Sequence, residues 1–164
     1  MPKEKEESKL ANLKKDYKKI QEKYKLPSFE ELNEDFGIEK AADEETDILI
    51  REIRKHVSEK VFNYLRFVET LLNPVNAPMS ILSVVKTLGS EDRDKLAEVY
   101  KKFVKSELQL VLTDIEFSEE REAEFIKETF KTWQEAKKEM IDVLGKVEKN
   151  LENKSESNGR KYFG

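Results

Sequence analysis

The sequence predicts an all-α fold, an elongated bundle of four long helices and two short ones. Apolar residues recur with helical spacing through most of the 164-residue chain. The four prolines lie outside these periodic stretches and only five glycines occur, so helices can be long. No alternating, β-branched stretch is typical of a strand. We expect one helical domain at residues 1–152 and a disordered tail at 153–164.

The first helix is expected at residues 8–25, as a candidate peripheral element. Its apolar residues follow one another at steps of three and four, which gives a narrow seam of two residues per heptad. Lysine and glutamate fill the other positions, and Pro27 ends the helix. The seam consists of Leu10, Leu13, Tyr17, Ile20 and Tyr24.

A short second helix is expected within LPSFEELNEDFG, residues 26–37. Ser28 and Glu31 match the Ser-x-x-Glu pattern of a capping box, which closes the first turn of a helix. Gly37 follows the last apolar residue, at the position where a helix often ends in a left-handed residue. Residues 38–47 are acidic and are expected to be a linker.

The apolar residues of this short segment are Phe29, Leu32 and Phe36, which share one helical stripe. Short amphipathic helices with this spacing commonly dock into a groove. These three residues are therefore the candidate partner-docking residues. We expect the groove on this chain, and a second copy or a different protein remain as alternatives.

Four more helices follow. The one expected at 44–73 is apolar on several sides, which is typical of a central, buried element. A short helix is expected at 79–88, and Ser90 and Ser118 are expected to cap the last two. The helix after Ser90 has its apolar residues at Leu96, Val99, Tyr100, Phe103, Val104, Leu108, Val111 and Leu112. The last helix, at about 119–151, would be about 50 Å long, so it either lengthens the bundle or overhangs it.

The composition excludes most of the common catalytic and cofactor-binding motifs. The chain has no cysteine and one histidine, which excludes Ser-His-Asp, Cys-His and multi-histidine metal sites by count. The glycines do not cluster, so neither a phosphate-binding loop nor a dinucleotide fingerprint is present. We therefore expect no enzymatic activity, no metal and no cofactor.

The composition also indicates where the protein works. No secretory leader and no membrane span are predicted, so we expect a cytoplasmic protein. The 27 glutamates and 25 lysines against three glutamines are typical of heat-adapted proteomes.

His56 is the only histidine, with Glu52 four residues before it and Lys60 four after it on the same helical face. One interpretation is a half-site for a metal or a pH-sensitive contact. The interpretation that we favour is a surface or boundary histidine flanked by charges.

The lysine-rich first helix indicates nucleic acid as an alternative partner. Residues 1–27 carry nine lysines and five acidic residues, whereas residues 28–47 carry nine acidic residues and one lysine. Basic side chains contact phosphates, and the candidate contacts are Lys14, Lys15, Lys18 and Lys19. The net charge of −4 and the acidic residues within the helix argue against this alternative.

Three phrases of the sequence carry a resemblance: YKLPSFEELNEDF, LIREIRKHVSEK and EREAEFIKETFKTWQEAKKEM. Together they resemble a family of small archaeal all-helical proteins without assigned function. The resemblance covers residues 17–151. It implies an archaeal, heat-adapted source, and it implies neither an activity nor site residues.

The leading hypothesis from the sequence is a non-enzymatic interaction or scaffold protein. It rests on the long last helix, the thin seam of the first helix and the absence of catalytic motifs. The partner would be a second copy, giving a homodimer, or another protein.

Overall fold

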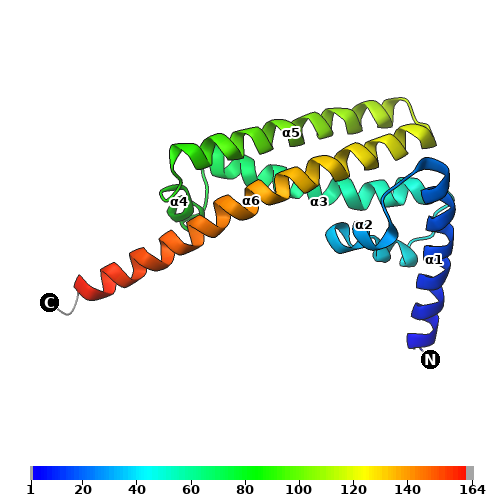
Figure 1. The fold of residues 1–164 in the computed structure, drawn as a ribbon, viewed down its shortest axis with the longest axis horizontal. Helices are drawn as coiled ribbons and strands as arrows, with labels where there is room; N and C mark the ends of the chain where they lie inside the picture. Colours follow the sequence, from blue (N-terminus) through cyan, green and yellow to red (C-terminus); the bar gives the residue numbers. More distant parts are fainter. Residues whose placement is uncertain (1, 162–164) are drawn as a thin grey trace. The chain divides into compact units, whose positions relative to one another are not determined.

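The computed structural model describes the backbone of residues 2–161 and the side chains of residues 5–155. It confirms the all-α class, because every element in the described part of the chain is a helix (Figure 1). In order these are α1 (Pro2–Tyr24), α2 (Phe29–Phe36), the 3₁₀ helix η1 (Ile38–Asp43), α3 (Leu49–Leu72), α4 (Met79–Val85), α5 (Ser90–Ile115) and α6 (Glu119–Lys161). None of these helices is long and apolar enough to cross a membrane.

The chain divides into two compact units. The first contains Met1–Phe62 and Lys105–Thr132, and the second contains Asn63–Val104 and Trp133–Gly164. The helices α3, α5 and α6 therefore contribute one part to each unit, whereas α1, α2 and η1 belong to the first unit alone.

The core of the first unit is formed by buried side chains of α1, α2, η1 and the first-unit parts of α3, α5 and α6, elements that can be followed in Figure 1. Tyr17 of α1 is fully buried, and its hydroxyl group donates a hydrogen bond to the carbonyl oxygen of Pro27 at 2.7 Å. Its ring meets Phe29 edge-on at 5.6 Å between centroids. Burial in this core raises the pKa of the Tyr17 phenol, so the group remains a donor.

The core of the second unit is built around Trp133 of α6. The rings of Tyr64 and Phe103 lie 5.2 Å and 6.3 Å from it, measured between centroids. Across the surface of this unit, Lys95 and Lys102 of α5 each form an ion pair of 2.8 Å with α6, to Asp142 and Glu135. The contact of Phe103 with Trp133 and these two ion pairs thus join α5 to α6 in the second unit, while Tyr64, which is 37% exposed, adds α3.

Several segments differ from the sequence-based expectation. The helix α1 begins at Pro2 rather than at residue 8, and α3 begins at Leu49 rather than at residue 44. Residues 38–43 form η1 instead of a linker. Ile38 and Ala41 are three residues apart and so share one side of a 3₁₀ helix, which buries both. The helix α6 does not end near residue 151 but continues through Lys161. Its last turns are rich in Glu, Lys and Asn, and no proline interrupts them. Of the tail predicted to be disordered, residues 162–164 lie outside the described residues.

The capping box of α2 is present as expected. The Ser28 hydroxyl group accepts from the Glu31 N–H at 3.2 Å, and the Glu31 carboxylate accepts from the Ser28 N–H at 2.8 Å. Gly37 ends the helix with a left-handed backbone, at a φ of 62°. The hydroxyl and N–H groups of Ser28 lower the pKa of Glu31, because both bind its charged form.

Replacing Ser28 by alanine should lower the free energy of unfolding by about 1 kcal/mol, because one N–H group at the start of α2 loses its acceptor. The lowered pKa of Glu31 means that its contribution is present above its unfolded pKa and is lost as the pH falls through its folded pKa. The S28A variant should therefore lose less stability on acidification than the wild type. Urea unfolding at pH 7 and at acidic pH measures both effects, and equal acid sensitivity of the two proteins would contradict the second.

Candidate interaction surfaces

The most unusual surface of the first unit is an exposed apolar stripe on α5. Leu108, Val111, Leu112 and Ile115 are 61%, 51%, 58% and 71% exposed, and we call these four residues the α5 face. They follow one another at positions i, i+3, i+4 and i+7, so they lie on one side of the helix. An apolar stripe of this kind on a soluble protein is typical of an interaction site.

The opposite side of α5 faces the core of the unit. Ser106 and Thr113 are buried there, at 2% and 6% exposure. The Thr113 hydroxyl group donates to the carbonyl oxygen of Gln109 at 2.9 Å, so its polar atom is satisfied within the helix. In this last part of α5 the two buried residues are therefore small and polar, while four large apolar residues face outward. Nearer the start of the helix the inward side is apolar, with Leu96, Val99 and Phe103 buried.

A shallow groove of about 190 Å³ lies beside the α5 face, between α5 and α6. Its lining residues are Gln109, Leu112, Thr113, Arg121, Glu124, Phe125 and Glu128. Leu112 belongs to both the face and the groove, so the two form one continuous surface. Of the lining side chains, Phe125 is buried at 4% exposure and supplies an apolar floor.

A buried ion network fixes α5 and α6 beneath this surface. Arg54 of α3 donates through Nε to Glu122 at 2.7 Å and through Nη2 to Asp114 at 2.9 Å. The Glu122 side chain is completely buried, and Arg51 lies 3.4 Å from its second oxygen. One residue of α3 thus binds α5 and α6 together with charge-assisted hydrogen bonds.

The turn from α5 to α6 is held by further contacts. The Arg51 guanidinium group lies 4.0 Å from the centroid of the Phe117 ring, a cation–π distance. Glu116 and Arg121 form an ion pair across the turn. The Ser118 hydroxyl group accepts from the N–H of Arg121 at 3.2 Å, which caps α6 as the sequence predicts. These contacts fix the turn that joins the end of α5, which carries the α5 face, to the start of α6.

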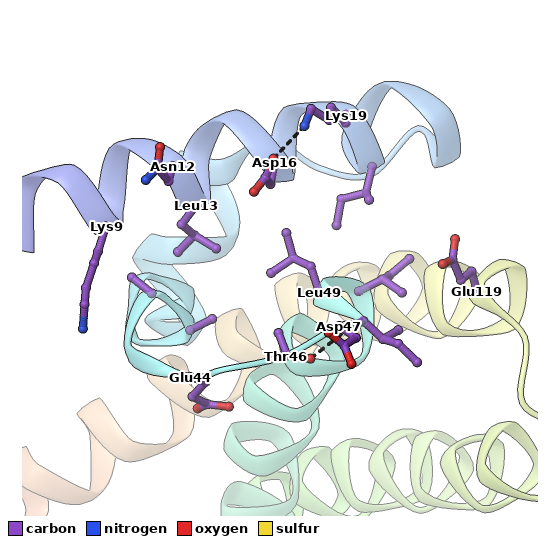
Figure 2. A pocket seen from close by; sticks show the side chains of 15 residues that line it. Lys9, Asn12, Leu13, Asp16, Lys19, Glu44, Thr46, Asp47, Leu49 and Glu119 are labelled. Carbon is purple, nitrogen blue, oxygen red and sulfur yellow. Dashed lines mark hydrogen bonds and ion pairs between the residues drawn. The ribbon is translucent and has the colours of Figure 1, made fainter.

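A second concave region is a cleft of about 540 Å³ beneath α1 (Figure 2). Its apolar lining is Leu13, Ile20, Ala41, Ala42, Ile48, Leu49 and Ile50, and its polar lining is Lys9, Asn12, Asp16, Lys19, Glu44, Thr46, Asp47 and Glu119. Figure 2 shows α1 on one side and the loop before α3 on the other. Since the rim carries both signs of charge, it favours no single class of ligand.

The helix α1 is fastened across this cleft at both ends. Lys9 pairs with Asp43 at 3.0 Å, and the Tyr24 hydroxyl group donates to Glu119 at 2.5 Å. Lys23 lies 3.4 Å from the same carboxylate. The Tyr24 hydroxyl and then Lys23 lower the pKa of Glu119, since both bind its charged form.

His56 lies beside a pair of carboxyl groups rather than on an open surface. Its Nε2 atom is 3.3 Å from Glu44 Oε1, and its side chain is 13% exposed. The neighbouring Glu52 carboxyl group raises the pKa of Glu44, and the contact with Glu44, together with Lys55, lowers that of Glu52. Lys55 pairs with Glu52 at 2.7 Å. Among the described side chains, those of residues 5–155, no three of the metal-binding types cluster as a metal site.

The sequence did not reveal the contact of Glu44 with Glu52 and His56, because Glu44 lies in the acidic segment that was expected to be a linker. The short helix η1 brings that segment back to α3. The sequence did contain one local indication of η1: the apolar residues Ile38 and Ala41 are three residues apart, and the structure buries both.

The candidate partner-docking residues lie inside the chain's own core. Phe29, Leu32 and Phe36 are 6%, 0% and 6% exposed. Phe29 packs on Tyr17, and Phe36 meets Phe130 of α6 edge-on at 6.4 Å between ring centroids. The groove for α2 is therefore on this chain, and the structure does not present these residues to a partner.

The four candidate nucleic-acid lysines lie on the exposed side of α1. Lys14 is 3.4 Å from Glu30 and lies over the Phe29 ring, and Lys19 pairs with Asp16 at 2.7 Å. Lys15 and Lys18 form no ion pair with any described residue. Two of the four charges are thus partly neutralised within the chain.

Comparisons of the chain with models of protein families, with curated proteins and with solved structures found no match.

Proposed function

We propose that this protein is a non-enzymatic helical interaction protein, which binds another protein chain through the α5 face. The observation that carries the proposal is the exposure of Leu108, Val111, Leu112 and Ile115 on a single stripe. Leaving such side chains in water forgoes about 1.5–3 kcal/mol for each one that could be fully buried. A partner that covers them would recover part of this free energy.

The surroundings of the α5 face support the same function. The ion network of Arg54, Glu122 and Asp114 and the contact of Arg51 with Phe117 hold the helices in place before binding. A surface that is rigid before binding loses little conformational entropy on association. The adjoining groove offers a place for one apolar side chain of the partner.

Site-specific photocrosslinking tests the proposal. A benzophenone amino acid at position 112 should give a discrete protein adduct, in an extract of the source organism or with the purified chain alone. The same amino acid at position 141, where the native isoleucine is 64% exposed, is the matched control and should give none. Adducts from neither position, or equally from both, would contradict the proposed role of the α5 face.

The alternative to this proposal is binding to nucleic acid through the lysines of α1, of which Lys15 and Lys18 are exposed and form no ion pair with a described residue. A protein that contacts phosphates in this way would bind DNA or RNA with steep salt dependence. We expect no retardation of duplex or single-stranded probes, even at low salt. Retardation that disappears in the double variant Lys15→Ala and Lys18→Ala would favour nucleic acid instead.

We further propose a cytoplasmic location, since no secretory leader or membrane span is predicted and the chain has no cysteine. We also propose a heat-adapted source, on the abundance of glutamate and lysine, and an archaeal one, which only the resemblance to small archaeal helical proteins implies. Thermal unfolding checks the second point. A midpoint within the mesophilic range of about 45–65 °C would contradict it.

A further inference from the structure

The charges around the α5 face have mainly one sign. Residues 105–128, which form the end of α5, the turn and the start of α6 in the first unit, contain eight acidic and three basic residues. The segment therefore carries a net charge of −5 around an apolar stripe. This combination of apolar contact and charge restricts the class of chain that fits.

Several of these acidic groups are already neutralised within the unit. Five of the eight are paired: Glu122 and Asp114 bind Arg54, Glu116 binds Arg121, Glu119 lies 3.4 Å from Lys23, and Glu124 pairs with Lys127 at 2.9 Å. The pair of Glu124 and Lys127 is exposed, so water or a partner can replace it at little cost.

Three acidic side chains remain without an ion pair among the described residues, namely Glu107, Glu120 and Glu128. Glu124 and Glu128 are one helical turn apart on α6, and both line the groove beside Leu112.

We propose that the α5 face and its groove bind a basic amphipathic helix of another protein. The apolar side of that helix would cover Leu108, Leu112 and Ile115, and its lysine or arginine side chains would lie beside Glu124 and Glu128. The inference rests on the proposed function, since it names the partner of the same surface. Helix-in-groove binding of this type uses apolar residues at helical spacing for contact and flanking charges for specificity.

The same charges argue against a second copy of this chain as the occupant. In a two-fold dimer the same surface patch meets itself, so the acidic residues of one copy would lie against those of the other. The chain has a lysine-rich amphipathic helix of its own, α1. Its apolar residues Leu13 and Tyr17 are buried in the first unit, at 6% and 0% exposure, and cannot also cover α5.

Fluorescence anisotropy with two designed peptides tests the inference on the full chain. One peptide of about 18 residues, long enough to form a helix on binding, places leucine on one face and lysine on the other. The second has the same leucines with glutamate in place of lysine. We expect the lysine peptide to bind about tenfold more tightly than the glutamate peptide, and to weaken as salt rises from about 0.05 to about 0.5 M.

Two pairs of variants locate the binding. Leu112→Ser should weaken the lysine peptide about tenfold, as for a central interface residue, whereas Ile141→Ser should have no effect. The double variant Glu124→Lys and Glu128→Lys should also weaken it. The matched control, Glu139→Lys and Glu148→Lys, changes the net charge equally at other exposed positions of α6 and should not. Circular dichroism verifies that each variant is folded.

The results that would overturn the basic partner differ from those that would overturn the interaction function. Equal effects of the two charge variants, or no effect of Leu112→Ser, would show that the peptide is attracted by net charge alone and would overturn the inference. Preferred binding of the glutamate peptide would overturn it too. A crosslinked adduct at position 112 with the mass of two copies would overturn the basic partner while leaving the interaction function in place.

Discussion

Replacing Arg54 by alanine should lower the free energy of unfolding by about 3–5 kcal/mol, because the substitution leaves a buried carboxylate without its main partner. Arg54 is the only side chain that binds Glu122 and Asp114 together in the described part of the chain, and it is 7% exposed. Without it, the completely buried Glu122 retains only Arg51 at 3.4 Å. Denaturation in guanidinium chloride measures the loss directly.

Two further variants test whether the loss of stability comes from the unpaired buried charge. The double variant Arg54→Met and Glu122→Leu removes both charges and should recover most of the lost stability, because apolar residues of similar size fill the same space. Lys101→Ala breaks an exposed ion pair with Glu98 and should leave the denaturation midpoint unchanged within error. A loss in R54A no larger than in the Lys101 variant would refute a structural role for the network.

Replacing Leu32 by alanine should cost about 2–5 kcal/mol of unfolding free energy, because the side chain is completely buried and its removal leaves a cavity. Equilibrium denaturation measures the total loss. Hydrogen exchange should in addition show faster exchange of the α2 amides, since Leu32 is the central apolar residue of that helix. The conservative change Leu32→Met keeps most of the volume and should cost less than about 1.5 kcal/mol.

The Leu32 variant also tests whether α2 docks on its own chain. Docking within one chain makes the loss independent of protein concentration, whereas docking on a second copy would make the stability of the wild type rise with concentration. Denaturation at two concentrations that differ about a hundredfold separates these cases. A concentration-dependent midpoint would contradict the contacts of Leu32 and its neighbours described here.

Much of the helical structure follows from local sequence rules. Three caps involve neighbouring residues only and can therefore be predicted from the sequence. They are the capping box of Ser28 and Glu31, the left-handed Gly37 and the Ser118 cap. The burial of Phe29, Leu32 and Phe36 together agrees with their spacing on one stripe. That their groove lies on this chain depends on Tyr17 and Phe130, which are distant in sequence.

The candidate binding surface was not predictable in the same way. In the sequence, the apolar residues of α5 from Leu96 to Leu112 recur at helical spacing throughout. Nothing in this pattern distinguishes the residues that are buried from those that are exposed. Because successive residues turn by about 100° around the axis, Leu96, Val99 and Phe103 share one side while Leu108 and Leu112 lie on the other. The first three are buried and the last two are exposed. Only the packing of neighbouring helices decides which side is covered.

The division of the chain into two units has a consequence for how the protein is made. The first unit needs residues 105–132 to complete the core into which α1 and α2 pack. On the ribosome, Phe36 therefore emerges long before its partner Phe130, at synthesis rates of about 5–20 residues per second. During those seconds the nascent chain exposes apolar side chains that the finished protein buries. Transiently exposed apolar surface of this kind is prone to aggregation. Each unit consists of two separate segments of the chain, so neither can be produced alone as one continuous fragment.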